Sequence, residues 1–320
     1  MLRLARSLIA AALFAGQWNA VAASNPDTKT CTVFMGTTPS GEPLKNLLQL
    51  PPKADALRWE LTLETDTKGL TPSRYKLQCD VVLSPGMNEK KISTITRQGK
   101  CAVTKGTKSD SEASVIALDN VFSLVQITKS LLHILNPDRS LMVGSAGFSY
   151  TLNQVEAAEK PGDLALALSR PSISYTNSPL SQGPSVFGVF EGRTPGIGIA
   201  RELGFPDDSG RLKVKWRITL FQDPETKTPT TYRAENSLYR GRPREGKWSI
   251  TKGTAENPNA IVYSLTATDA GPELCLLKGD DNVLFLLNHR KEPMIGHGDF
   301  SYTLNRRQNA PDQAQDINRR

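Results

Sequence analysis

The chain of 320 residues is poor in the residue types from which catalytic and metal sites are built. It has three histidines, His133, His289 and His297, which do not lie close together, and none of its four cysteines forms a CxxC pair. A GxSxG nucleophile motif is also absent. A general base at His297 beside Asp299 is conceivable, but a surface-loop histidine is the favoured interpretation. The sequence therefore predicts no catalytic residue, metal ligand or cofactor.

Strong charge of one sign is also missing. The formal net charge is +7, and it becomes +5 if Arg3 and Arg6 are removed with a leader peptide. Acidic and basic residues alternate along the chain, and no basic stripe is interleaved with aromatic residues, so nucleic-acid binding is not expected. Beyond the N-terminus, no run approaches the roughly 18 apolar residues of a membrane-spanning helix. No membrane span is expected.

Residues 1–23 have the pattern of a secretory signal peptide. Two arginines precede the apolar stretch 8–15, and Ala20-Val21-Ala22 is a small-residue cleavage site. A buried N-terminal helix is the alternative, but the apolar run is short and nothing caps it. No lipid-attachment motif precedes Cys31. We expect an exported protein, periplasmic or secreted, without a lipid anchor.

The chain contains an internal repeat. Phe-Ser-Tyr-Thr-Leu-Asn occurs at 148–153 and again, letter for letter, at 300–305. Two further pairs of blocks recur in the same order, at 33–39 and 189–195, and at 99–107 and 246–254. Because the offset changes only slightly between blocks, the sequence indicates a tandem duplication of one domain of roughly 120 residues, long enough to bury its own core.

The repeat divides the chain into segments. Repeat 1 covers residues 31–154 and repeat 2 covers 185–307. Between them, residues 155–184 are rich in proline, serine, alanine and glycine, which is typical of a linker. The polar tail 308–320 has almost no apolar residue and is expected to be disordered.

Within each repeat, apolar residues recur at every second position. The segments 57–63 and 212–220 alternate strictly, which places every apolar side chain on one face of a strand. Consecutive strands of this kind favour an all-β fold, an antiparallel meander of seven or eight strands closed into a barrel. After each Thr-Pro, residues 44–48 and 199–203 predict one helical turn or a lid-like loop.

The cysteines are distributed unevenly between the repeats. Cys79 and Cys101 align with Asn236 and Trp248, so both are present in repeat 1 and both are absent from repeat 2. This pattern predicts a Cys79–Cys101 disulfide between consecutive strands, as suits an oxidising compartment. The alternative is two buried thiols that behave as small apolar residues. For Cys31 and Cys275, a bond between the domains and free thiols both remain open.

Aromatic residues recur at matching positions of the repeats. Trp59 and Tyr75 correspond to Trp216 and Tyr232. These four are the candidate ligand-binding residues if each barrel encloses a cavity for a small apolar or amphipathic molecule. The alternative is that they fill the barrels as core residues.

The pattern Val-Phe-x-Gly-x-Thr-Pro at 33–39 and 189–195, followed by an alternating strand and Phe-Ser-Tyr-Thr-Leu-Asn, resembles the N-terminal domain of NlpE-like copper-homeostasis lipoproteins. That resemblance implies a lipocalin-like barrel and a location in the cell envelope. The family's CxxC loop and lipid-attachment cysteine are missing here, so a copper site is not carried over. We expect a non-catalytic exported protein that binds a small molecule or an envelope component. The alternative is a structural or envelope-stress module that binds another protein.

Overall fold

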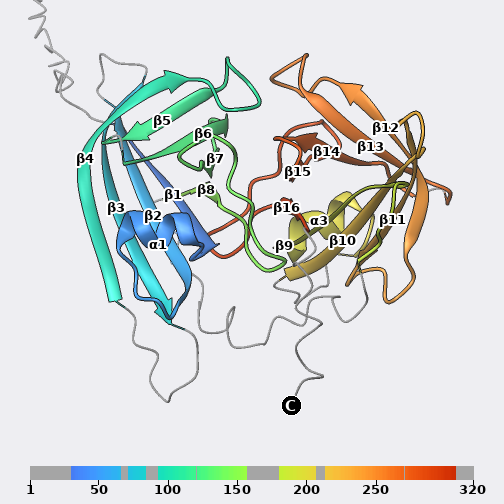
Figure 1. The fold of residues 1–320 in the computed structure, drawn as a ribbon, viewed down its shortest axis with the longest axis horizontal. Helices are drawn as coiled ribbons and strands as arrows, with labels where there is room; N and C mark the ends of the chain where they lie inside the picture. Colours follow the sequence, from blue (N-terminus) through green and yellow to red (C-terminus); the bar gives the residue numbers. More distant parts are fainter. Residues whose placement is uncertain are drawn as a thin grey trace, which may run out of the picture.

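The computed structural model describes residues 30–65, 71–83, 93–119, 121–156, 180–206, 213–269 and 271–307. These form two closed antiparallel barrels of eight strands each, which lie side by side (Figure 1). The prediction of an all-β fold with tandem meander barrels is therefore confirmed. The predicted signal peptide, the tail 308–320 and most of the linker 155–184 lie outside the described residues.

Each barrel is a simple meander in which every strand pairs with the next. The first barrel consists of β1 (Thr30–Pro39), β2 (Ala54–Thr65), β3 (Pro72–Leu83), β4 (Ser93–Lys105), β5 (Ser114–Leu118), β6 (Phe122–Thr128), β7 (Leu131–Ile134) and β8 (Thr151–Val155). The second consists of β9 (Val186–Pro195), β10 (Lys213–Gln222), β11 (Pro229–Asn236), β12 (Arg244–Lys252), β13 (Ile261–Ala267), β14 (Leu274–Lys278), β15 (Val283–Leu286) and β16 (Thr303–Arg306).

The barrels close where the first strand meets the last. β1 pairs with β8, and β9 pairs with β16. A glycine of the repeated Val-Phe-x-Gly block lies at each closure. A Cβ on Gly36 would lie 2.6 Å from the Thr151 carbonyl oxygen, and one on Gly192 would lie 2.5 Å from that of Thr303. The two glycines therefore recur because backbone approaches too closely there for any side chain.

The alternating apolar residues point into the barrels, as the period of two predicts. In β2, Leu57 and Trp59 have no exposed surface and Leu61 has almost none; in β10, Trp216 and Ile218 are equally buried. The interiors hold one apolar cluster each, built from inward side chains of nearly all the strands. The strands are therefore held together by two separate, densely occupied cores.

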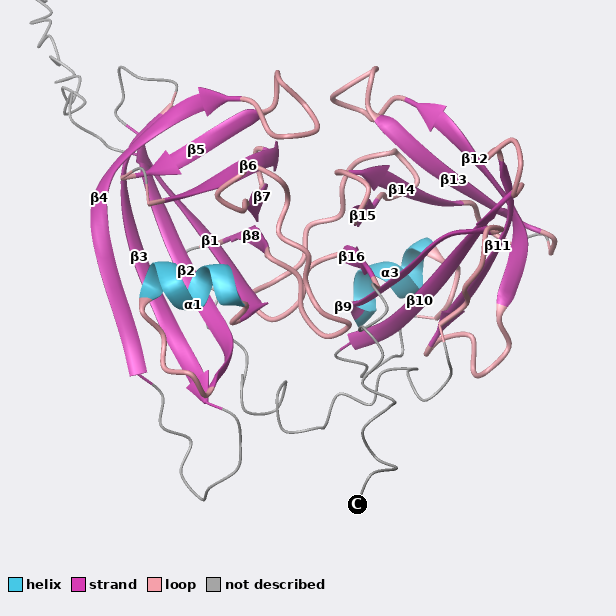
Figure 2. Ribbon diagram, in the orientation of Figure 1, coloured by secondary structure: helices cyan, strands magenta, loops and turns pink. Residues whose placement is uncertain are grey.

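One short helix packs against the core of each barrel, α1 (Glu42–Leu48) in the first and α3 (Gly196–Glu202) in the second (Figure 2). Of the two alternatives predicted after each Thr-Pro, the helical turn is therefore the correct one. α1 buries Leu44 and Leu48, and it ends where Gln49 adopts a left-handed backbone conformation. None of the helices in the described ranges has the length and apolar character needed to span a membrane.

Candidate functional site: the interface between the barrels

The four predicted ligand residues lie inside the barrel cores. The indole N–H of Trp59 donates to Thr38 Oγ1 over 2.9 Å, and the indole N–H of Trp216 makes the equivalent bond to Thr194 Oγ1 over 3.0 Å. The hydroxyl of Tyr75 donates to Asp119 over 2.8 Å. Burial raises the pKa of Tyr232 to about 12. All four side chains are almost fully buried, so the structure places them where core residues belong.

Cavities occur elsewhere in the described residues. One of about 440 Å³ is lined by side chains and backbone of β2, β3 and β4, namely Glu60, Thr62, Lys76, Leu77, Gln78, Thr96, Arg97 and Gln98. A second, of about 300 Å³, lies at the start of β9 beside Arg306 and Arg307. Neither is lined by any of the four predicted ligand residues. All the residues that line the first, except Leu77, have polar or charged side chains, unlike the apolar cavity that the sequence suggested.

The predicted Cys79–Cys101 disulfide is wrong, because both thiols are free. Cys79 on β3 pairs with Ile95 of β4, whereas Cys101 pairs with Leu118 on the next strand. Ile95 and Cys101 are six residues apart on one strand, which corresponds to about 20 Å, while a disulfide needs Cα atoms within about 7 Å. The alternative of two buried thiols is the correct interpretation. Cys31 and Cys275 are free as well.

The thiols should differ sharply in reactivity. Cys31 is exposed, whereas the other three are buried, and burial raises the pKa of Cys79 to about 12 and those of Cys101 and Cys275 to about 11. Because the thiolate is the reactive form, a thiol reagent at pH 8 should modify one cysteine in the native protein and four after denaturation. Two reactive cysteines in denatured, unreduced protein would contradict this assignment.

The repeated hexapeptide lies at the contact between the two barrels. Its residues alternate in direction. Tyr150 and Leu152 point into the first barrel, and Tyr302 and Leu304 point into the second. The serine, threonine and asparagine of each copy face the other barrel instead. We call this contact, formed by 148–153 and 300–305 with the loops before them, the barrel–barrel interface.

Equivalent residues meet across this interface. The rings of Phe148 and Phe300 are stacked, with centroids 5.8 Å apart and planes 3° from parallel. The Ser149 and Ser301 hydroxyls lie 2.6 Å apart, and those of Thr151 and Thr303 lie 2.9 Å apart. Each residue contacts its own counterpart, which is the pattern of a two-fold axis between the barrels.

The asparagines extend the two-fold pattern to the loops. Asn153 Oδ1 accepts the amide proton of Gly296 over 2.8 Å, and its Nδ2 donates to the His297 carbonyl over 3.0 Å. In the opposite direction, Asn305 Oδ1 accepts the amide proton of Gly144 over 2.7 Å. Both asparagines are fully buried. Each one therefore holds the loop of the other barrel by its backbone.

The tyrosines of the hexapeptide connect the interface to the helices. The Tyr150 hydroxyl accepts the amide proton of Gly41, at the start of α1, over 3.2 Å. The Tyr302 hydroxyl accepts from the amides of Gly198 and Ile199 in α3. Every side chain of the repeated motif thus has a contact, either in a core, at a helix or across the interface.

A chain of hydrogen bonds runs through the interface, and His133 on β7 lies near one end of it. Its Nε2 donates to the Met142 carbonyl over 2.9 Å, so Nδ1, 2.9 Å from the Thr151 hydroxyl, accepts. Thr151 then accepts from Thr303, which accepts from Ser301 over 3.0 Å. Since each hydroxyl donates once, the neutral tautomer of His133 fixes the direction of the whole chain.

The interface surrounds His133 with apolar and uncharged groups. The ring of Phe285, its counterpart in the second barrel, stands edge-on to it at 5.7 Å. Phe285 and Val283 share an apolar cluster with Leu135 and Leu141 of the first barrel. Burial lowers the pKa of His133 to about 4. The histidine is therefore neutral at physiological pH.

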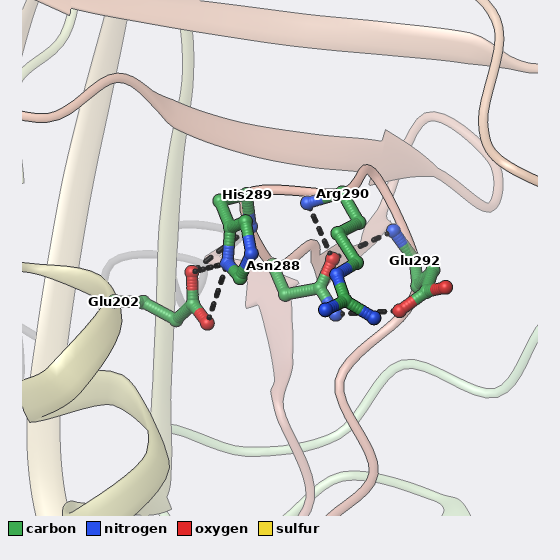
Figure 3. Close-up of polar contacts among 5 residues, drawn as sticks. All are labelled: Glu202, Asn288, His289, Arg290 and Glu292. Atoms are coloured by element: carbon green, nitrogen blue, oxygen red, sulfur yellow. Dashed lines mark hydrogen bonds and ion pairs between the residues drawn. The ribbon is translucent and has the colours of Figure 1, made fainter.

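The remaining histidines are structural or peripheral. His289 lies in the exposed turn after β15, where its Nδ1 is 3.2 Å from a carboxylate oxygen of Glu202 at the end of α3 (Figure 3). In the same turn, the side-chain Oδ1 of Asn288 accepts from the backbone amides of Arg290 and Glu292 (Figure 3). His297 Nδ1 accepts from the amide of Asp299. Within the described ranges, no three histidine, cysteine or acidic residues are grouped as metal ligands would be.

The sequence analysis did not identify the interface residues. Ser149, Thr151 and Asn153 lie on the polar side of an alternating strand, which is ordinarily the solvent side. Their exact recurrence in repeat 2 was the available signal, because solvent-facing polar residues have little physical reason to stay identical. Comparison with family models, with curated proteins and with solved structures gave no match.

Proposed function

We propose that the protein is an exported, non-catalytic two-barrel module that acts through its outer surface, by binding another protein or a component of the cell envelope. In this proposal the barrels carry no small ligand. The observation that supports it best is the dense packing of the barrel interiors. The largest inward side chains, Trp59 and Trp216, are buried with their indole N–H groups bonded to Thr38 and Thr194. A ligand in either barrel would have to displace these contacts.

The barrel–barrel interface supports a role in which the two barrels bind a partner in one fixed relative orientation. A buried, hydrogen-bonded contact between equivalent residues holds the two barrels in one relative orientation. One chain then presents two copies of each surface loop at a fixed spacing, which raises affinity for a partner that reaches both. The turns that begin at Lys105 and Lys252 are one such pair. They share positive φ angles of 94° at Gly106 and 100° at Gly253.

The non-catalytic part of the proposal follows from the histidines. His133 is enclosed between the barrels and His297 is engaged in the interface loop. His289 is paired with a carboxylate on the surface, with no nucleophile among its described partners. Export is proposed from the signal-peptide pattern of residues 1–23, and the resemblance to NlpE-like domains is a second argument for the proposed envelope location.

Native mass spectrometry of protein purified from the periplasm tests the proposal. We expect the mass of the chain without residues 1–23 and without a bound organic molecule. Crosslinking in intact cells before purification should add the mass of a partner. The runner-up function, a ligand inside each barrel, predicts instead two copies of one organic molecule per chain. Recovery of such a molecule would contradict the proposal, and so would a protein found only in the cytoplasmic fraction with residues 1–23 intact.

A further inference from the structure

The two-fold pattern of the interface is broken where charged side chains of each barrel face the loop of the other. In the first barrel, neighbouring strands place Thr37 opposite Arg58. Both reach the loop of the second barrel, where Thr37 Oγ1 donates to the Gly298 carbonyl over 3.0 Å and Arg58 forms an ion pair with Asp299. This side of the interface therefore has one cation and one anion.

On the opposite side of the interface, the numbers of positive and negative charges are not equal. Arg193 and Lys215 are the counterparts of Thr37 and Arg58, and they also lie opposite each other on neighbouring strands. The loop they face carries Gly147 at the position equivalent to Asp299. Two cations thus stand where the other side has one, and the loop that faces Arg193 has no carboxylate at the position of Asp299.

Arg193 is buried without a carboxylate partner in the described part of the chain. Its exposed fraction is only 6%, and burial alone lowers its pKa, with no acidic group acting against that effect. Burial and the nearby Arg193 also lower the pKa of Lys215. Since a guanidinium stays charged even when buried, the site carries positive charge that favours an anion.

The backbone at Gly147 lies next to the Arg193 guanidinium and admits a side chain there. A Cβ built on Gly147 would lie 3.8 Å from Arg193 Nη1, and its nearest neighbour would be Ser145 Oγ at 3.5 Å. These are ordinary van der Waals distances, so a Cβ fits at this position without displacing its neighbours. The Ser145 hydroxyl accepts from the amides of Gly147 and Phe148, both over 3.1 Å, and its own proton is available to donate.

We propose that Arg193, beside Lys215 and facing Gly147, forms a binding site for a small oxyanion of the carboxylate or phosphate type. The planar guanidinium offers paired donors that match two oxygens of such a group, and the Ser145 hydroxyl offers a third. The bound anion takes the place that the Asp299 carboxylate occupies on the opposite side of the interface.

The test compares the thermal stability of the full chain in sodium acetate, sodium phosphate and sodium chloride at equal ionic strength. An anion that binds only the native state raises Tm, and we expect a rise of about 2 °C in 100 mM acetate or phosphate over chloride. Arg193→Gln should abolish the rise. The exposed Lys129→Gln is the matched control and should keep it.

The variant Gly147→Asp tests the proposed anion site independently. It places a carboxylate beside Arg193, as Asp299 does beside Arg58, so it should raise Tm in chloride and remove the response to acetate and phosphate. This variant keeps the proposal testable if Arg193→Gln fails to fold. No rise in the wild type, an equal rise in Arg193→Gln, or a response that survives Gly147→Asp would each overturn the proposal.

Discussion

Replacing Asn153 by alanine should destabilise the protein by about 2–6 kcal/mol, more than the same replacement of Asn305. Asn153 makes two hydrogen bonds across the interface, so its loss removes the bonds to the half-buried Gly296 amide and His297 carbonyl. Each such group costs about 1–3 kcal/mol. Asn305 makes one bond, to the Gly144 amide, and we expect a cost of about 1–3 kcal/mol.

Urea unfolding of the two variants measures this difference. Gln154→Ala is the matched control, because Gln154 lies next to Asn153 on β8 but is exposed. Its effect should stay within about 0.5 kcal/mol. Equal costs for the two asparagines, or a larger cost for Asn305, would show that the interface does not contribute through these bonds.

A second large effect is expected from His133 as the pH falls. The unfolded chain takes up a proton near pH 6.5, whereas burial lowers the pKa of His133 in the native protein to about 4. Between these values the unfolded state binds more protons, so stability is full above pH 6.5 and is lost as the pH falls to 4. The loss should be about 3 kcal/mol.

The variant His133→Phe isolates this contribution, because phenylalanine is the residue at the equivalent position 285. Its free energy of unfolding should fall by about 3 kcal/mol less than that of the wild type between pH 6.5 and pH 4. His289→Gln is the control, since His289 is exposed, and it should follow the wild type. Identical pH profiles for His133→Phe and the wild type would refute the buried neutral histidine.

The barrel strands could be predicted because the pattern that determines each strand lies within a few neighbouring residues. Alternation in 57–63 and 212–220 depends only on which face of a strand is buried, and the helical turns follow from apolar spacing within a few residues. The Cys79–Cys101 pairing failed for the opposite reason. Both residues face the barrel interior, as expected, but their separation depends on the register of β3 against β4, which alternation leaves undetermined.

The interface could not be predicted from the sequence for a related reason. Arg58 and Asp299 form an ion pair although 241 residues separate them, and nothing in either segment indicates the other. The aromatic residues also show what the sequence alone leaves undetermined. Trp59 and Trp216 recur at equivalent positions whether they line a cavity or fill a core, and only the packing around them distinguishes the two cases.

The two-fold contact has a consequence for how such a protein changes over time. In two copies of a single barrel joined by this contact, one substitution in the gene would alter both sides of the axis together, so every contact would occur twice in identical form. Once both copies lie on one chain, each side mutates alone. His133 opposite Phe285, and Asp299 where the other loop has Gly147, are pairings that only a fused gene can encode.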